Sequence, residues 1–143
     1  MLRWIAGGVL AAVLLTGCGD PDQKLRENAA QTARTASSEV NTTRLVVEQL
    51  QARRLWAQPA RRMVDDSEKS LGKTADSFST QQPSTEQSAR LYEQVNSALD
   101  DAVSAVTVVR IALENDDLAA AERQLPALRL SGKDLDQIGE LAK

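Results

Sequence analysis

The stretch that decides the fold is STEQSARLYEQVNSALDDAVSAVTVVRIALE, residues 84–114. Its apolar side chains recur at steps of three and four residues over about eight turns, which is the spacing of one face of an α-helix. They are Leu91, Val95, Ala98, Leu99, Ala102, Ala105, Val106, Val109 and Leu113. Val103, Val108 and Ile111 widen this face, so we expect the helix to be central, with neighbours on more than one side.

Residues 84–87 mark the beginning of this helix, because Ser84-Thr85-Glu86-Gln87 has the pattern of a capping box. A polar loop that ends at Pro83 separates it from a second predicted helix over 60–79. The apolar stripe of that second helix consists of Val64, Leu71, Ala75 and Phe78.

A further helix is predicted over 20–57. Asp20-Pro21-Asp22-Gln23 offers an N-cap oxygen, a proline at the first helical position and a capping-box partner. The apolar face is thin at first, so residues 20–43 are expected to form a stalk-like start wherever nothing packs on them. Pro59 disfavours helical geometry at Gln58, so the helix should end or kink there. The predicted apolar positions are Leu25, Ala29, Ala33, Ala36, Val40, Val47 and Leu50.

After the central helix, Asn115-Asp116-Asp117 separates it from a helix that Pro126 should strain or end. We expect Ser131-Gly132-Lys133-Asp134 to cap a short last helix. No segment shows the alternating pattern of a β-strand. The sequence therefore predicts an all-α antiparallel bundle of about four helices, with the last helix bent or split near Pro126–Gly132.

Composition excludes several kinds of chemistry. The chain has no histidine, which removes the commonest general base and metal ligand, and its acidic pairs are expected to be solvated faces and helix caps. These pairs are Asp65-Asp66, Asp100-Asp101 and Asp116-Asp117. Aromatic residues make up only 3% of the chain, and no basic excess is present, which argues against a nucleic-acid-binding protein. We therefore expect no enzyme activity, no metal and no cofactor, with a carboxylate-only hydrolase as a distant alternative.

The N-terminus has the pattern of a secretory signal. Positive charge at Met1 and Arg3 precedes an apolar run from Trp4 to Leu15. A transmembrane anchor is the rival interpretation, but the uncharged run to Gly19 is shorter than the roughly 20 residues that cross a bilayer.

The run ends in Leu15-Thr16-Gly17-Cys18, which resembles a bacterial lipobox, the site of type II signal peptidase. This resemblance implies that residues 1–17 are a cleaved signal peptide. It also implies that Cys18 becomes the lipid attachment point, carrying palmitate-type acyl chains, of a mature domain over 18–143. Two or more acyl chains make a durable membrane anchor. The mature domain keeps 16 of the 17 basic residues against 20 acidic ones, a formal charge of −4.

The lipobox predicts an extracytoplasmic protein anchored to the bacterial cell membrane. In lipoproteins that are sorted between two membranes, an aspartate directly after the cysteine often signals retention in the inner membrane. Here Gly19 holds that position and Asp20 follows, so the choice between inner and outer membrane stays open.

Four arginines and a tryptophan gather around the expected bend, and they are candidate partner-binding residues. They are Arg53, Arg54, Trp56, Arg61 and Arg62. Guanidinium groups bind anionic groups in forked geometry, and a tryptophan can anchor a partner. The more ordinary interpretation is a solvated arginine face with Trp56 packed into the end of the bundle.

These observations favour a non-catalytic, lipid-anchored envelope protein whose helical bundle is a binding or scaffold module. Its partner would be another envelope protein or an anionic wall polymer, because a straight first helix would place the arginines roughly 50 Å from the lipid. The alternative is a small-ligand-binding or sensing lipoprotein, with an apolar pocket lined by Val106, Val109 and Leu125.

Overall fold

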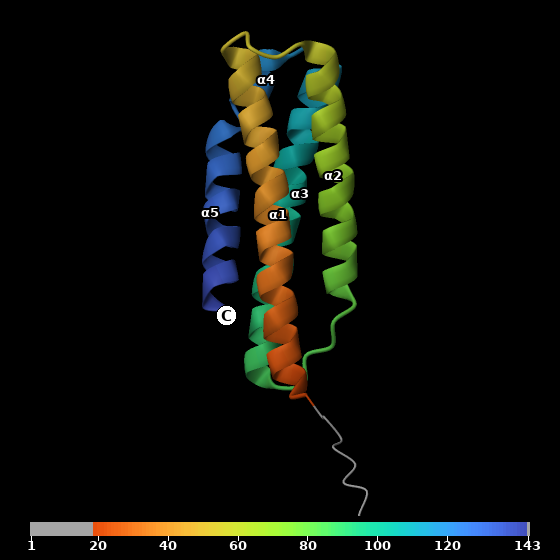
Figure 1. Cartoon of the computed structure of the whole chain (residues 1–143), viewed down its shortest axis with the longest axis vertical. Coiled ribbons are helices and arrows are strands. Elements are labelled where there is room, and N and C mark those ends of the chain that lie inside the picture. Colours follow the sequence, from red (N-terminus) through yellow and green to blue (C-terminus); the bar gives the residue numbers. More distant parts are fainter. Residues whose placement is uncertain (1–18, 143) are drawn as a thin grey trace, which may run out of the picture.

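The computed structural model describes residues 19–142 (Figure 1). In that range the chain forms helices and no β-strand, so the predicted all-α class is confirmed. The predicted signal peptide and lipobox, with Cys18, lie outside the described residues. The helices are α1 (Pro21–Gln51), α2 (Ala57–Ser79), α3 (Glu86–Glu114), α4 (Leu118–Glu122) and α5 (Leu125–Leu141).

The helices form an antiparallel bundle. In Figure 1, α1 runs from one end of the molecule to the other, and α2 and α5 lie on opposite sides of the pair formed by α1 and α3. The short α4 and the longer α5 together make the last, interrupted helix of a four-helix bundle, as predicted. Of the helices in residues 19–142, none has the length and apolar character that a membrane span requires.

The core lies where α3 meets its neighbours. Val95, Leu99, Val106 and Val109 are completely buried, and α3 packs against α1, α2 and α5, which confirms neighbours on more than one side. The helix shares the central position with α1, which packs against α2, α3, α4 and α5. Val108 and Ile111, which were expected to widen the buried face, are instead exposed. Val108 lies on the wall of an open groove between α3 and α5, which leaves it accessible to solvent.

The first half of α1 is part of the bundle and not a stalk. Ala29, Ala33 and Ala36 are completely buried. A Cβ atom added to Gly139 of α5 would lie 3.8 Å from the main-chain oxygen of Ala30 and 4.0 Å from the Cβ of Ala33. Small side chains on both helices thus let α5 approach α1 closely, and this close packing replaces the large apolar side chains that the segment lacks.

The first helix ends at Gln51, six residues before the predicted end at Ala57. The amide groups of Arg53 and Arg54 bond back to the carbonyl groups of Leu50 and Gln49 at 3.0 and 2.9 Å, the pattern of a Schellman motif.

Pro59 neither ends nor kinks α1. It lies in the first turn of α2. Amide groups in the first turn of a helix have no intrahelical partner, so the missing N–H of proline costs nothing there.

The last helix is interrupted at Arg123 and Gln124, beside Pro126, which lies in the first turn of α5. The predicted cap at Ser131-Gly132-Lys133-Asp134 is wrong, because α5 runs through these residues without a break. Gly132 has a packing role instead: an added Cβ atom would lie 3.3 Å from the side-chain oxygen of Asn41 on α1.

The capping box that begins α3 lies one residue later than predicted. Thr85 is the N-cap, and its reciprocal partner is Ser88 rather than Gln87. The Asp22 carboxylate accepts hydrogen bonds of 2.7 Å from the hydroxyl groups of both Ser84 and Thr85, which ties the beginning of α1 to the beginning of α3.

Candidate binding surface

The five residues that the sequence singled out come together at one end of the bundle. Arg53, Arg54 and Trp56 lie in the loop between α1 and α2, while Arg61 and Arg62 lie in the first two turns of α2. In Figure 1 this loop is at the end of the molecule opposite the start of α1. The 31 residues of α1 place it about 46 Å from Pro21.

Trp56 projects into solvent, with 84% of its surface exposed. The expectation that it packs into the end of the bundle is therefore wrong. Leu55, one residue earlier, packs against the core in its place. Trp56 itself is the extended N-cap residue of α2, and its side chain makes no capping bond. An exposed tryptophan of this kind contributes nothing to the core.

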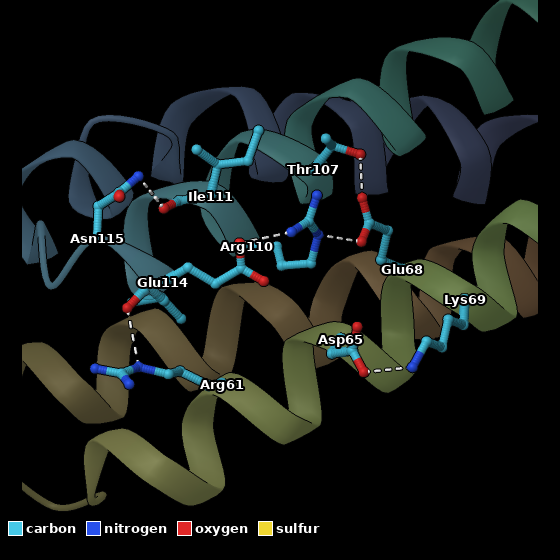
Figure 2. Close-up of polar contacts among 10 residues, drawn as sticks. Arg61, Asp65, Glu68, Lys69, Thr107, Arg110, Ile111, Glu114 and Asn115 are labelled. Carbon is cyan, nitrogen blue, oxygen red and sulfur yellow. Dashed lines mark hydrogen bonds and ion pairs between the residues drawn. The ribbon is translucent and has the colours of Figure 1, made fainter.

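Arg61 has a structural role that the sequence did not reveal. Its Nε donates a hydrogen bond of 3.0 Å to the main-chain oxygen of Leu113, and its guanidinium group also pairs with Asp116. Figure 2 shows Arg61 reaching from α2 toward the end of α3. This arginine closes the C-terminal end of a helix, where cations and donors are favoured. The Arg61 side chain is therefore engaged within the protein and is not freely available to a partner.

Three acidic groups near this end of the bundle are also engaged. Glu114 pairs with Arg110 at 2.8 Å, and Asp65 pairs with Lys69 at 2.6 Å. Asp117 is the N-cap of α4 and accepts a hydrogen bond of 2.9 Å from the amide of Ala120.

The remaining arginines are not engaged in this way. Within residues 19–142, Arg53, Arg54 and Arg62 form no ion pair, and all three are exposed. We call Arg53, Arg54, Trp56 and Arg62 the distal tip. It carries three positive charges and one exposed aromatic ring at the same end of the bundle.

Arg53 has a backbone conformation that is unusual for a residue with a side chain. Arg53 has a φ of 56°, in the left-handed region that glycine adopts without cost. A residue with a Cβ atom in this region raises the energy of the folded chain by roughly 1–2 kcal/mol. Asp116 has the same φ, but its side chain is held by Arg61. Within residues 19–142, the Arg53 side chain makes no comparable contact that would offset this cost.

A network of charged side chains joins α2 to α3 beside the distal tip. Glu68 accepts a hydrogen bond of 2.6 Å from the Thr107 hydroxyl and also pairs with Arg110 (Figure 2). Hydrogen bonding to Glu114 and Glu68, opposed by burial, raises the pKa of Arg110 above its ordinary value. These groups bond to one another, so the network fastens α2 to α3.

No acidic cluster of the described chain has the geometry of a metal site. Between residues 19 and 142 there is no group of three or more aspartate, glutamate, cysteine or histidine side chains that could hold a metal ion.

Other grooves lie elsewhere on the bundle, but the apolar pocket expected at Val106, Val109 and Leu125 is not among them. Val106 and Val109 are completely buried and Leu125 is 7% exposed, so these residues belong to the packed core. A groove of about 260 Å³ does lie between α3 and α5, but it is lined by other residues, including Val108 and Leu130.

A groove of about 660 Å³ lies between α1 and α5. Its two arginines, Arg44 and Arg129, both bond to Glu48, and these bonds lower the pKa of the Glu48 carboxyl although its burial acts in the opposite direction. The two arginines of this groove are therefore paired within the protein, whereas Lys133 on its wall forms no ion pair in the described chain.

Comparisons with protein-family models, with curated proteins and with solved structures found no match.

Proposed function

We propose that the protein is a non-catalytic, lipid-anchored protein of the bacterial cell envelope, and that its distal tip binds an anionic macromolecule of that envelope. The observation that carries this proposal is Trp56, which is 84% exposed beside three arginines that pair with nothing in the described chain. Tryptophan and arginine are the residues most enriched among those that dominate binding energies.

The chemistry of the tip supports an anionic partner. Arg53, Arg54 and Arg62 can each donate forked hydrogen bonds to a carboxylate or a phosphate group. Exposed charges of this kind raise the rate of encounter with an oppositely charged partner, and an aromatic ring that becomes buried adds affinity. The left-handed φ of Arg53 supports the same conclusion, because strain retained at an exposed side chain is typical of functional positions.

The position of the tip supports a partner away from the parent membrane. The lipobox sequence places the proposed lipid at Cys18, two residues before the N-cap of α1. The distal tip lies at the other end of α1, about 46 Å from Pro21. An upright bundle on such an anchor would present Trp56 to the surrounding envelope.

Lipid anchoring is tested with Cys18→Ser in cells that produce the full chain. We expect the wild type to incorporate labelled palmitate and to sediment with membranes, and the variant to do neither. Equal labelling of both proteins would disprove attachment at Cys18.

Partner binding is tested by pull-down from cross-linked envelopes. Arg53→Gln, Arg54→Gln and Arg62→Gln are combined in one variant, and Lys24→Gln, Arg26→Gln and Arg34→Gln in a control. The control removes the same charge from exposed residues in the first half of α1. We expect the tip variant to lose its cross-linked partner and the control to retain it. Unchanged capture by the tip variant would overturn the proposal.

A further inference from the structure

A small apolar depression lies beside the distal tip. It has a volume of about 180 Å³, and the ends of four helices form it. Leu50 comes from α1, Ala57 from α2, Leu113 from α3 and Leu118 from α4, with Arg61 and Asp116 at the polar edge. Ala57 directly follows Trp56 in the chain, so the depression lies at the same end of the bundle as the exposed tryptophan, although Trp56 itself does not line it.

The walls of this depression are already in place in the free protein. Leu113 is buried, Leu50 and Leu118 pack against the core, and the contact between Arg61 and Asp116 holds the edge. A site that is formed before binding loses little conformational freedom when it is filled. A cavity of about 150 Å³ lined by apolar side chains accommodates benzene, so about 180 Å³ fits one leucine, methionine or phenylalanine side chain.

The surface continues along α2. A groove of about 630 Å³ shares Arg61 with the depression and is lined by Pro59, Arg62 and Met63 among others. Met63 is 42% exposed. A partner segment that placed one side chain in the depression could therefore contact an unpaired arginine and a further apolar side chain beyond it.

Two classes of anionic macromolecule would use this surface differently. A phosphate-rich or carboxylate-rich polymer would engage Arg53, Arg54 and Arg62 and leave the apolar depression and Trp56 without a role. A protein segment can supply carboxylates and an apolar side chain together. Building on the proposed function, we propose that the partner is a protein, and that the distal tip binds an acidic segment whose single large apolar side chain enters the depression at Ala57.

The inference is tested with a phage-displayed library of random peptides, selected on the full chain in detergent micelles. Enriched sequences are synthesised, each with a version in which the apolar residue is alanine. The protein variant is Ala57→Phe, which fills the depression from an exposed position at the start of α2. Its control is Ala127→Phe, the same change at an exposed position of α5. Polyphosphate serves as the polymer probe, and circular dichroism confirms that both variants fold.

We expect enriched peptides to combine acidic residues with one large apolar residue. Alanine in the peptide, or Ala57→Phe in the protein, should weaken binding roughly tenfold or more, the equivalent of one buried apolar side chain. The Ala127→Phe protein should bind as the wild type does. The alanine peptides measure the same contact without any change in the protein.

The inference is wrong if the enriched peptides lack acidic residues or lack a large apolar residue. It is also wrong if the Ala57→Phe protein binds these peptides as well as the Ala127→Phe protein and the wild type do. If the protein binds polyphosphate and the selection enriches no peptide, the partner is a polymer. The proposed function would then stand, and this inference would fail. The proposed function would fail on a different result: the variant with all three arginines replaced would capture the same partner as the wild type in the envelope pull-down.

Discussion

The Nε atom of Arg61 lies 3.0 Å from the main-chain oxygen of Leu113, so a side chain of α2 closes the C-terminal end of α3. The same guanidinium group holds Asp116, which has a left-handed backbone, in the turn before α4. This contact fixes the start of α2 against the end of α3 and thereby positions Trp56, which lies five residues before Arg61. Arg61 is thus a positioning residue, whereas Arg62 next to it is available to a partner.

Replacing Arg61 should destabilise the bundle. Arg61→Gln loses a charge-assisted hydrogen bond and an ion pair, and because the side chain is 38% exposed we expect a loss of only about 1 kcal/mol in the free energy of unfolding. Arg62→Gln is the control and should change stability by less than about 0.5 kcal/mol. Urea unfolding followed by circular dichroism measures both. Equal effects of the two variants would contradict the role given to Arg61.

Replacing Arg53 by glycine should separate stability from binding. Glycine adopts a φ of 56° without strain, so we expect Arg53→Gly to be more stable by about 0.5–1 kcal/mol after the entropy of glycine in the unfolded chain is included. The same variant should capture less partner, since it lacks one cation of the tip. Thermal unfolding and envelope pull-down measure the two effects. If the Arg53→Gly protein were less stable than the wild type and captured as much partner, the arginine would be retained for folding.

The contact between Asp22 and the start of α3 should make stability depend on pH. Hydrogen bonds from Ser84 and then Thr85 lower the pKa of the Asp22 carboxyl below its ordinary value. A carboxyl group with a lowered pKa in the folded state stabilises the fold at pH values above its pKa in the unfolded chain, which is about 3.9, and this contribution is lost as the pH falls through the lower folded value.

The test compares the wild type with Asp22→Asn. We expect the wild type to be more stable at neutral pH and the difference between the two proteins to shrink as the pH falls below about 4. Urea unfolding at several pH values gives this difference directly. A difference that does not change with pH would rule out the ionised form of Asp22 as its cause.

Glycines at two positions of the bundle should respond in opposite ways to larger side chains. A Cβ atom added to Gly72 in α2 would meet nothing within 4 Å, so Gly72→Ala should gain up to about 1 kcal/mol from its higher helix propensity. Gly139 faces Ala30 and Ala33 of α1, so Gly139→Leu should lose about 1–3 kcal/mol through overpacking. Chemical unfolding of the two variants measures both changes in the free energy of unfolding. A tolerated leucine at Gly139 would mean that α5 does not pack closely on α1.

Periodicity predicted the helices well where the apolar face was strong. The repeat from Leu91 to Leu113 identified α3 and its central position, because a broad buried face can be satisfied only by several neighbours. The first half of α1 could not be assigned in the same way. Its alanines indicate little buried area when taken alone, and their packing depends on Gly132 and Gly139, about 100 residues later in the chain.

The candidate surface was found only in part. The arginine and tryptophan pattern located the tip, but the turn that exposes Trp56 depends on a left-handed residue, and the usual sequence signal for such a residue is glycine. Arginine at position 53 gives no such signal. Nor could the sequence separate Arg61 from Arg62, because their different roles follow from the position of Leu113, 52 residues further along the chain.

The measurement that tests the account most directly is photo-cross-linking in intact cells. A photoreactive phenylalanine analogue replaces Trp56 in one strain and Leu130 in another, since Leu130 is 61% exposed on α5 and does not belong to the distal tip. The account predicts a defined protein adduct at position 56 that disappears when Arg53, Arg54 and Arg62 are changed to glutamine, and no such adduct at position 130. The absence of an adduct at position 56, or the same adduct at both positions, would contradict it.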